Sequence, residues 1–234
     1  MKVTPPPVKI AAQELGLQVL QPEKIRDSAV VSRLRELHPD LMVVVAYGQI
    51  IPPDVLSIPA KGVVNVHASL LPRHRGAAPV AGAILAGDRE TGVTIMRMDA
   101  QLDHGPILAM RATPIGSGED AAALTRRLAE MGAELLAETL DRLDEIQPAE
   151  QDHAMATTAP RLRRVDGELD WGLDAEEIDR RVRGLQPWPG VTLPTSRGRV
   201  KVLSGHVEGD RYVPDMVQLP GKRPAPAKQV LGDA

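Results

Sequence analysis

The chain has 234 residues, 43% of them hydrophobic and 25% charged, which is the composition of a globular protein with one large or two modest domains. Its formal net charge of −3 excludes binding to nucleic acid through the charge of the whole molecule. The absence of cysteine excludes disulfides, thiolate metal sites and cysteine nucleophiles.

The first half of the chain alternates helical and strand-like segments. Residues 8–16 and 23–37 have helical spacing, and the second segment ends before a proline, as a helix should. The apolar run Leu41–Ala46 predicts a strand covered on both faces, and Val63–His67 predicts a second strand. The other expected elements are a helix at Pro79–Ala86, paired strands at Thr91–Met98 and Pro106–Ile115, and a long helix at Ala121–Ile146. This order predicts an α/β layer with a mainly parallel sheet.

The composition changes after Gln147. Residues 148–160 are polar and resemble a linker, and they are followed by an expected helix at 174–184 and short strand-like runs between glycines and prolines. We therefore expect an α/β domain over 1–147, a linker over 148–160 and a small β-rich domain over 161–234. Trp171 and Trp188 are expected to be core and turn residues of that second domain.

Three polar residues are candidates for catalysis. Asn65 and His67 lie two apart at the end of a predicted strand and therefore face the same side of the sheet, at the edge where α/β proteins gather functional groups. Taken alone, a histidine at the end of a strand is more often a hydrogen-bonded structural residue. Asp103 lies in the turn DAQLDHG between two expected strands, which can bring its carboxylate over the same crevice.

These residue types suit acyl transfer between two bound substrates. A carboxylate beside a histidine fixes its tautomer and raises its pKa, and an asparagine amide can donate to an oxyanion. A serine hydrolase is disfavoured because no G-x-S-x-G motif occurs. The scattered histidines form no H-x-x-H or H-E-x-x-H motif, so we expect no metal site.

The runs NVHASLLPRHRGAAPV and AGDRETGVTIMRMDAQLDHGPIL resemble the folate-dependent formyltransferases, and among them those that act on methionyl-tRNA. In the second half, APRLRRVDGELDW and QPWPG resemble that family's linker and C-terminal β-barrel. The resemblance implies a Rossmann-like catalytic domain and an OB-like second domain. It also implies 10-formyltetrahydrofolate as the donor and the α-amino group of methionine on initiator tRNA as the acceptor, for translation initiation in a bacterium.

The same resemblance assigns roles to individual residues. Asn65, His67 and Asp103 match the catalytic trio, with a protonated His67 stabilising the oxyanion. The segment Ser69, Leu70, Leu71 and Pro72 matches residues that contact the folate, and Tyr47 and Gly48 would help to line the pterin pocket. His74 and His104 replace residues that are common in the family and are expected to be surface variants.

Basic residues are the candidates for contact with the tRNA. Arg73 and Arg75 either reach an anionic substrate or anchor their own loop. Within the basic stretch that ends at Lys228, the candidates are Arg197, Arg199, Lys201, Lys222 and Arg223. A solvated basic face explains that stretch as well.

The start of the chain departs from the family pattern, because MKVTPPPVK resembles the segment after the family's first strand–helix–strand unit. We therefore expect a truncated catalytic domain, and three alternatives stay open: an inactive fragment, a formyltransferase acting on another amine such as an amino sugar-nucleotide, or a non-catalytic folate- or tRNA-binding module. The chain is expected to be cytoplasmic, because it has no signal-peptide core and no apolar run of about 20 residues. It is also expected to be a monomer.

Overall fold

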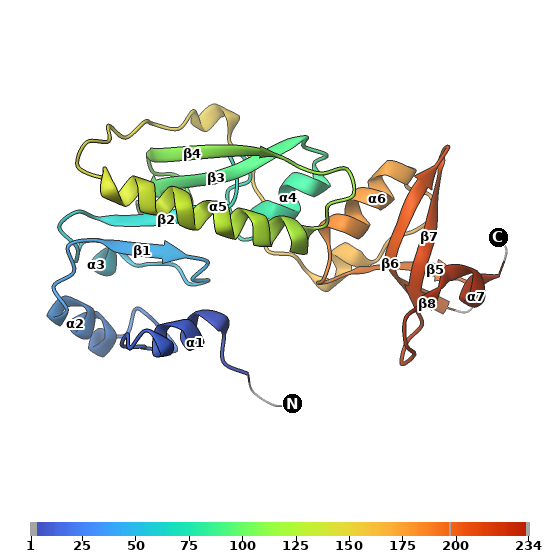
Figure 1. The fold of residues 1–234 in the computed structure, drawn as a ribbon, viewed down its shortest axis with the longest axis horizontal. Helices are drawn as coiled ribbons and strands as arrows, with labels where there is room; N and C mark the ends of the chain where they lie inside the picture. Colours follow the sequence, from blue (N-terminus) through green and yellow to red (C-terminus); the bar gives the residue numbers. More distant parts are fainter. Residues whose placement is uncertain (1–3, 197, 233–234) are drawn as a thin grey trace.

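The computed structural model describes residues 4–196 and 198–232. The first half forms α1 (Pro7–Glu14), α2 (Ser28–Glu36), β1 (Met42–Val45), α3 (Pro53–Leu56), β2 (Val63–His67), α4 (Pro79–Leu85), β3 (Glu90–Arg97), β4 (Ile107–Pro114) and α5 (Ala121–Asp141) (Figure 1). The second half forms the 3-10 turns η1 (His153–Met155) and η2 (Arg164–Gly167), then α6 (Ala175–Gly184), β5 (Val191–Thr195), β6 (Gly198–Glu208), β7 (Arg211–Gln218), β8 (Ala225–Pro226) and α7 (Ala227–Leu231).

The first sheet has the strand order β1-β2-β3-β4. β1 and β2 are parallel, whereas β3 runs antiparallel to both β2 and β4. The expected fold class is confirmed as a mixed sheet with helices, and the predicted hairpin of Thr91–Met98 with Pro106–Ile115 is present. Because β1 and β2 are parallel, the residues that follow Val45 and His67 emerge at the same edge.

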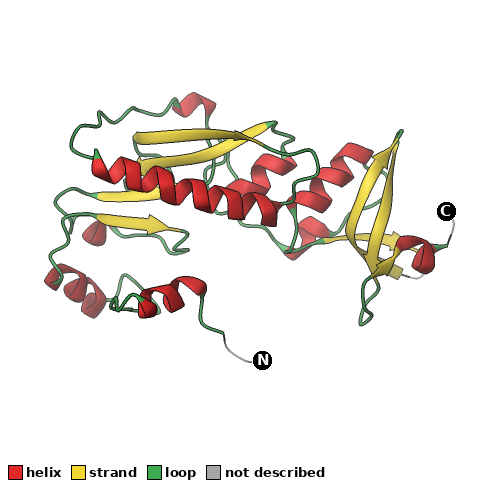
Figure 2. Cartoon of the chain, viewed as in Figure 1, coloured by secondary structure: helices red, strands yellow, loops and turns green. Residues whose placement is uncertain are grey.

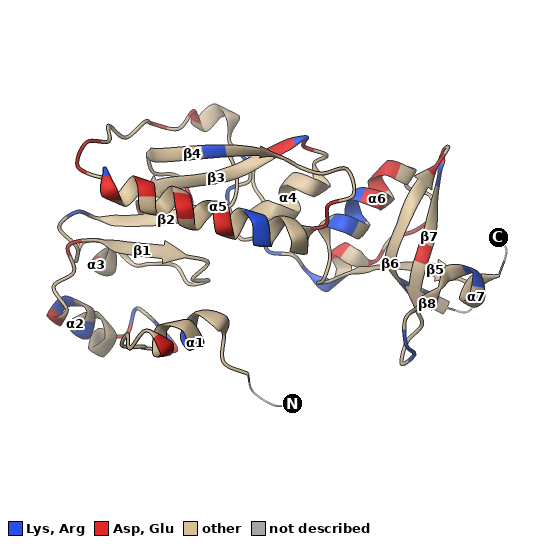
Figure 3. Cartoon of the chain, viewed as in Figure 1, with Lys and Arg blue, Asp and Glu red and all other residues tan. Residues whose placement is uncertain are grey.

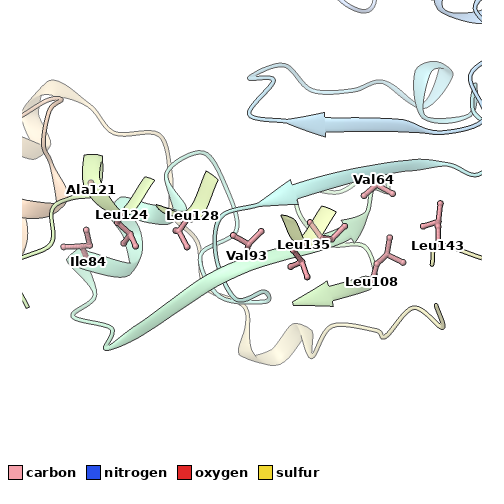
Figure 4. Packing of buried hydrophobic residues seen from close by; sticks show 10 residues of the cluster. Val64, Ile84, Val93, Leu108, Ala121, Leu124, Leu128, Leu135 and Leu143 are labelled. Atoms are coloured by element: carbon pink, nitrogen blue, oxygen red, sulfur yellow. The ribbon is translucent and has the colours of Figure 1, made fainter. Parts of the chain in front are cut away.

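One face of this sheet is covered by α5, which begins at the N-cap Asp120, whose side chain accepts a hydrogen bond from the Ala123 amide. The buried residues of α5 recur every three or four positions, which gives the helix one apolar side. They pack along the sheet as a continuous hydrophobic core (Figure 4). Its labelled members are Val64, Ile84, Val93, Leu108, Ala121, Leu124, Leu128, Leu135 and Leu143.

The expectation that β1 is covered on both faces is wrong. Among the described strands β1 pairs with β2 alone, so it is an edge strand. Val43 and Val45 are 40% and 58% exposed, because α5 lies over β2, β3 and β4 and does not reach them. Met42 and Val44 face the other way and pack with residues of α2 and α3.

The second sheet, β5-β6-β7-β8, is antiparallel throughout and lies at the opposite end of the molecule from α1 and α2 (Figure 2). Its core joins buried residues of α6, such as Ile178, to Val191, Leu193 and Val202. Trp188 is not a core residue, since it is 55% exposed. No helix in the described part of the chain is long and apolar enough to cross a bilayer.

The polar segment between the two sheets is bonded to the first of them. Ala149 exchanges two backbone hydrogen bonds of 2.8 Å with Ile107 at the start of β4. Further along, the Arg75 amide donates to the Thr157 carbonyl at 2.9 Å, and the Ala159 amide donates to the Arg75 carbonyl at 2.7 Å. The segment therefore fastens the loop after β2 to the hairpin of β3 and β4.

Candidate active site

Asn65 and His67 project from the face of the sheet opposite α5. Alternate residues of a strand point to opposite faces, and the alternates Val64 and Val66 pack into the core beneath α5. Asn65 pairs with Met96 of β3 and His67 with Thr94, so the two polar side chains stand at the carboxyl end of β2. The structure thus confirms that they share a face.

His67 is buried and faces Asp103. Its Nδ1 lies 3.7 Å from Oδ2 of Asp103, and the two side chains are 6% and 10% exposed. Its other nitrogen, Nε2, lies 3.0 Å from the carbonyl oxygen of His74. Because a carbonyl only accepts hydrogen bonds, the proton is assigned to Nε2, which leaves Nδ1 as the nitrogen that faces the carboxylate.

Asp103 has a strained backbone conformation, and its carboxylate is held by a hydrogen bond from the loop after β2. Its φ of 48° lies in the left-handed region, which for a residue other than glycine costs roughly 1–3 kcal/mol. The backbone amide of Gly76 donates to Oδ2 of Asp103 at 2.8 Å. Gly76 has a φ of 121°, and an added Cβ would lie 2.6 Å from the Ala159 carbonyl oxygen, so a side chain would push the loop away from the segment beneath it.

Burial lowers the pKa of His67 below its usual 6.5, and this effect outweighs Asp103, which raises that pKa. The expectation that Asp103 would bring a net rise is therefore wrong. The sequence shows the charge partner, but it does not show how completely water is removed from the imidazole. His67 is neutral at pH 7 as a result, and its Nδ1 can accept a proton.

The carboxamide of Asn65 has no hydrogen-bond partner in the described part of the chain, although the residue is half-buried. A neutral imidazole, a carboxylate beside it and an unoccupied amide donor therefore lie on one face. Together they can stabilise an oxyanion and remove a proton from an attacking amine. The described residues contain no group of three or more histidines and carboxylates able to hold a metal ion.

Two family models match the sequence: Formyl transferase over residues 2–140, and Formyl transferase, C-terminal domain, over residues 161–223. The chain belongs to the formyl transferase family. It is 53% identical to a methionyl-tRNA formyltransferase of Citrifermentans bemidjiense over 80% of its own length, and 46% identical to one of Geobacter metallireducens over 94%. It spans 59% of the length of the first relative and 72% of the second.

Solved structures share the fold. Methionyl-tRNA formyltransferase from Clostridium thermocellum is 18% identical with a TM-score of 0.67, and the match covers 90% of this chain and 91% of that one. A sugar N-formyltransferase from a Shewanella species is 20% identical with a TM-score of 0.69, covering 85% and 81%. The resemblance inferred from the sequence is confirmed.

The residues predicted to contact folate fall into two environments in this chain. Tyr47, 40% exposed, and Gly48 follow β1 at the carboxyl edge of the sheet. Ser69 is fully buried, and its carbonyl accepts from the Thr94 hydroxyl, which in turn accepts from the Leu71 amide. Ser69 and Leu71 thus shape the loop, while the half-buried Leu70 and Pro72 remain closer to solvent.

Arg73 and Arg75 both bond within the chain. Arg73 pairs with Asp88 at 2.5 Å, and the Arg75 guanidinium donates to Oε1 of Gln151 at 2.6 and 3.2 Å and contacts Nδ1 of His153 at 2.8 Å. These contacts favour the loop-anchoring interpretation. The expectation that His74 is a surface variant is wrong, because it is only 6% exposed and its Nε2 bonds Asp88 at 2.7 Å.

The basic residues of the second half of the chain differ in their contacts and in their exposure. Arg199 donates to the carbonyls of Leu169 and Thr192 at 2.6 and 2.8 Å, so it braces the sheet. Lys201 lines a cleft, and Lys222 and Arg223 are exposed in the basic loop between β7 and β8 (Figure 3). Arg197 lies outside the described residues.

Sequence reasoning missed Gln151, which is buried against the turn of Asp103. It stands in a polar segment with neither helical nor strand periodicity, so no pattern marks it. The stacking of His104 on His153, with ring centroids 4.0 Å apart, was likewise missed, because it joins residues 49 positions apart.

The lowered pKa of His67 predicts how stability depends on pH. Below pH 6.5 the unfolded chain binds a proton at this imidazole that the folded chain resists, so the free energy of unfolding falls as the pH drops through 6.5. Denaturant unfolding from pH 7.5 to 5.0 should therefore show a larger loss for the natural chain than for His67→Gln. An equal or larger loss in the variant would contradict the burial effect.

Proposed function

We propose that this chain transfers a formyl group from 10-formyltetrahydrofolate to the α-amino group of methionine on initiator tRNA, for translation initiation in the bacterial cytoplasm. The observation that carries the proposal is the convergence of Asn65, His67 and Asp103 in a chain 46% identical, over 94% of its length, to a methionyl-tRNA formyltransferase. We assign the chemistry to residues 1–147, a linker to 148–160 and contacts with tRNA to 161–234. We also propose that the chain acts as a monomer.

The proposed reaction needs no covalent enzyme intermediate. The lone pair of the amine attacks the formyl carbon, and the carbonyl oxygen that becomes negative accepts a hydrogen bond from the amide of Asn65. Nδ1 of neutral His67 takes the proton that the amine loses, and the carboxylate of Asp103 stabilises the imidazolium. The intermediate collapses by breaking the bond from the formyl carbon to the folate nitrogen N10, which receives the proton from His67.

The folate is proposed to lie at the carboxyl edge of β1 and β2. Tyr47 and Gly48 are exposed there, beside the loop of Ser69, Leu70, Leu71 and Pro72. The buried hydrogen bonds of the Thr94 hydroxyl with Ser69 and Leu71 support the shape of that loop. A rigid loop holds the donor next to Asn65 and His67 without the entropic cost of ordering it at each turnover.

The tRNA is proposed to contact the second half of the chain. A cleft of about 580 Å³ there is lined by the cations Arg164, Arg199 and Lys201 and by the indole of Trp188, which is 55% exposed. An exposed aromatic face among cations suits an unpaired base and its phosphates. Lys222 and Arg223 extend the basic surface at the β7–β8 loop.

The catalytic assignment is tested with alanine variants in an assay of formyl transfer to methionyl-initiator tRNA. Asn65→Ala and His67→Ala should each lower kcat by about 10²–10³, since each removes one donor or base from the reacting centre. The binding of tRNA should not change. The matched control is His206→Ala, because His206 also faces a carboxylate, Asp215 at 3.1 Å, but on the exposed surface of β6.

The same assay separates the alternatives. Transfer to an amino sugar-nucleotide but not to methionyl-tRNA would show that the acceptor is an amino sugar and not the tRNA. Binding of tRNA with no transfer to either acceptor would show that the chain is a non-catalytic tRNA-binding module. Activity in His67→Ala equal to that in His206→Ala would contradict the assigned mechanism.

Contact with tRNA is tested by charge reversal at the β7–β8 loop. Lys222→Glu combined with Arg223→Glu should weaken tRNA binding and reduce the slope of log affinity against log salt by about 1–2, because up to two phosphate contacts are lost. Lys24→Glu combined with Arg26→Glu, at two exposed residues before α2, changes the net charge by the same amount and serves as the control. An unchanged slope in the β7–β8 loop variant would remove this loop from the proposed tRNA surface.

A further inference from the structure

Gln151 is the buried polar residue of the segment between the two sheets, at 5% exposure. Its Nε2 donates to two backbone carbonyls, that of Asp103 at 3.0 Å and that of Gly105 at 2.7 Å. Its Oε1 accepts both hydrogen bonds from the guanidinium of Arg75. The carboxamide thus uses both donors and both acceptor positions, which is the complete hydrogen-bonding capacity of a glutamine side chain.

One of the two carbonyls that Gln151 binds belongs to the strained residue Asp103, and the other belongs to Gly105, two residues later. Asp103 has a φ of 48°, and Gly105 allows no side chain, since an added Cβ would lie 2.1 Å from the Arg97 carbonyl oxygen. Such a backbone conformation persists only where surrounding contacts determine it. Gln151 supplies two of those contacts, and Gly76 supplies a third through its amide to the carboxylate.

Arg75 joins Gln151 to the other side of the site. Its backbone lies in the loop after β2, and its amide and carbonyl bond Thr157 and Ala159. The next residue, Gly76, donates to Asp103. One carboxamide therefore connects the loop that follows His67 with the turn that carries Asp103.

We propose that Gln151 is a positioning residue that holds the turn of Asp103 so that its carboxylate faces His67 and Gly76. This inference rests on the proposed role of Asp103 in formyl transfer. Gln151 touches neither substrate nor reacting atoms in this account. It acts by fixing a carboxylate at a distance where about 1 Å of displacement weakens catalysis strongly.

The alternative is that Gln151 only fastens the segment to the first domain. A substitution would then cost stability without altering the electrostatic environment of His67. The two roles are separated by Gln151→Met, which keeps the length of the side chain but removes its donors and acceptors. Arg75 retains its contact with His153 in that variant. The matched control is Thr139→Val, because Thr139 is also a buried polar residue, and its hydroxyl donates to the Leu135 carbonyl at 2.6 Å. It lies in α5, on the other face of the sheet from the candidate site.

The first readout does not depend on activity. The pKa of His67 is followed by NMR of the imidazole, assigned with His67→Gln. The charged and titratable groups that act on His67 are Asp103, which raises its pKa, and His74 and Arg75, which lower it less strongly. If the Asp103 carboxylate moves away in Gln151→Met, the pKa of His67 should fall further below that of the natural chain, while Thr139→Val leaves it unchanged.

The second readout is formyl transfer. We expect Gln151→Met to lower kcat by about 10- to 100-fold with the KM for both substrates within about twofold. Thr139→Val should leave both kcat and KM within about twofold of the natural chain. An unchanged His67 pKa in Gln151→Met, or a kcat equal to that of the control, would overturn the positioning role. A shifted pKa in a chain that transfers no formyl group would uphold the positioning role and reject the proposed function.

Discussion

The candidate site depends on the hydrogen bonds that bind residues 149–159 to the loop after β2 and to the hairpin of β3 and β4. The sheet alone places Asn65 and His67, because both project from β2. It does not place Asp103, whose turn has a backbone conformation that the local sequence disfavours. The contacts of Gly76, Arg75 and Gln151 supply that placement, and each of them involves the connecting segment or the loop bound to it.

Burial sets the electrostatics of this arrangement. A carboxylate 3.7 Å from an imidazole in water would favour the imidazolium, yet His67 has lost most of its water and its pKa is lowered. The balance suits a base that starts neutral and becomes charged during the reaction, because the carboxylate then stabilises the charge that has just formed. The Nε2–His74 contact fixes the tautomer that this role needs.

Much of the fold follows from local sequence patterns, and the failures have specific causes. The strand Val63–His67 and the hairpin after it were predicted because β-branched runs and turn residues are short-range signals. The α2 helix begins at Ser28, five residues later than its spacing indicated, with Asp27 in extended conformation as its N-cap. The exposure of Val43, Val45 and Trp188 was not predicted, because whether an apolar residue is covered depends on neighbours far away in the sequence.

The candidate site, like the fold, was predictable only where local sequence patterns determine it. Asn65 and His67 share a face by the strand period alone, and the turn between two expected strands made Asp103 a third candidate. The resemblance to formyltransferases then assigned catalytic roles to all three. The tautomer of His67, its neutral state and the bonds of Gln151 arise from residues between 7 and 76 positions away, and no local pattern records them. The residues that bond Arg73 and Arg75 also lie far from them in the sequence. A basic sequence motif therefore does not show whether an arginine contacts a ligand or anchors its own loop.

The central claim is that neutral His67 accepts the proton of the attacking amine beside Asp103. The most direct test is the pH dependence of kcat/KM for formyl transfer to methionyl-initiator tRNA, because this profile reports ionisations of the free enzyme. Below about pH 8 the rate falls in every variant, because the α-amino group of the substrate, with a usual pKa of about 7.7–8.0, becomes protonated. The account predicts a further loss of rate below pH 6.5 that is set by His67, and this second limb moves to still lower pH in Asp103→Asn, because the group that raises the pKa of His67 is removed. A rate that rises as the pH falls through 6.5 would show that the imidazolium is the active form and would contradict the account.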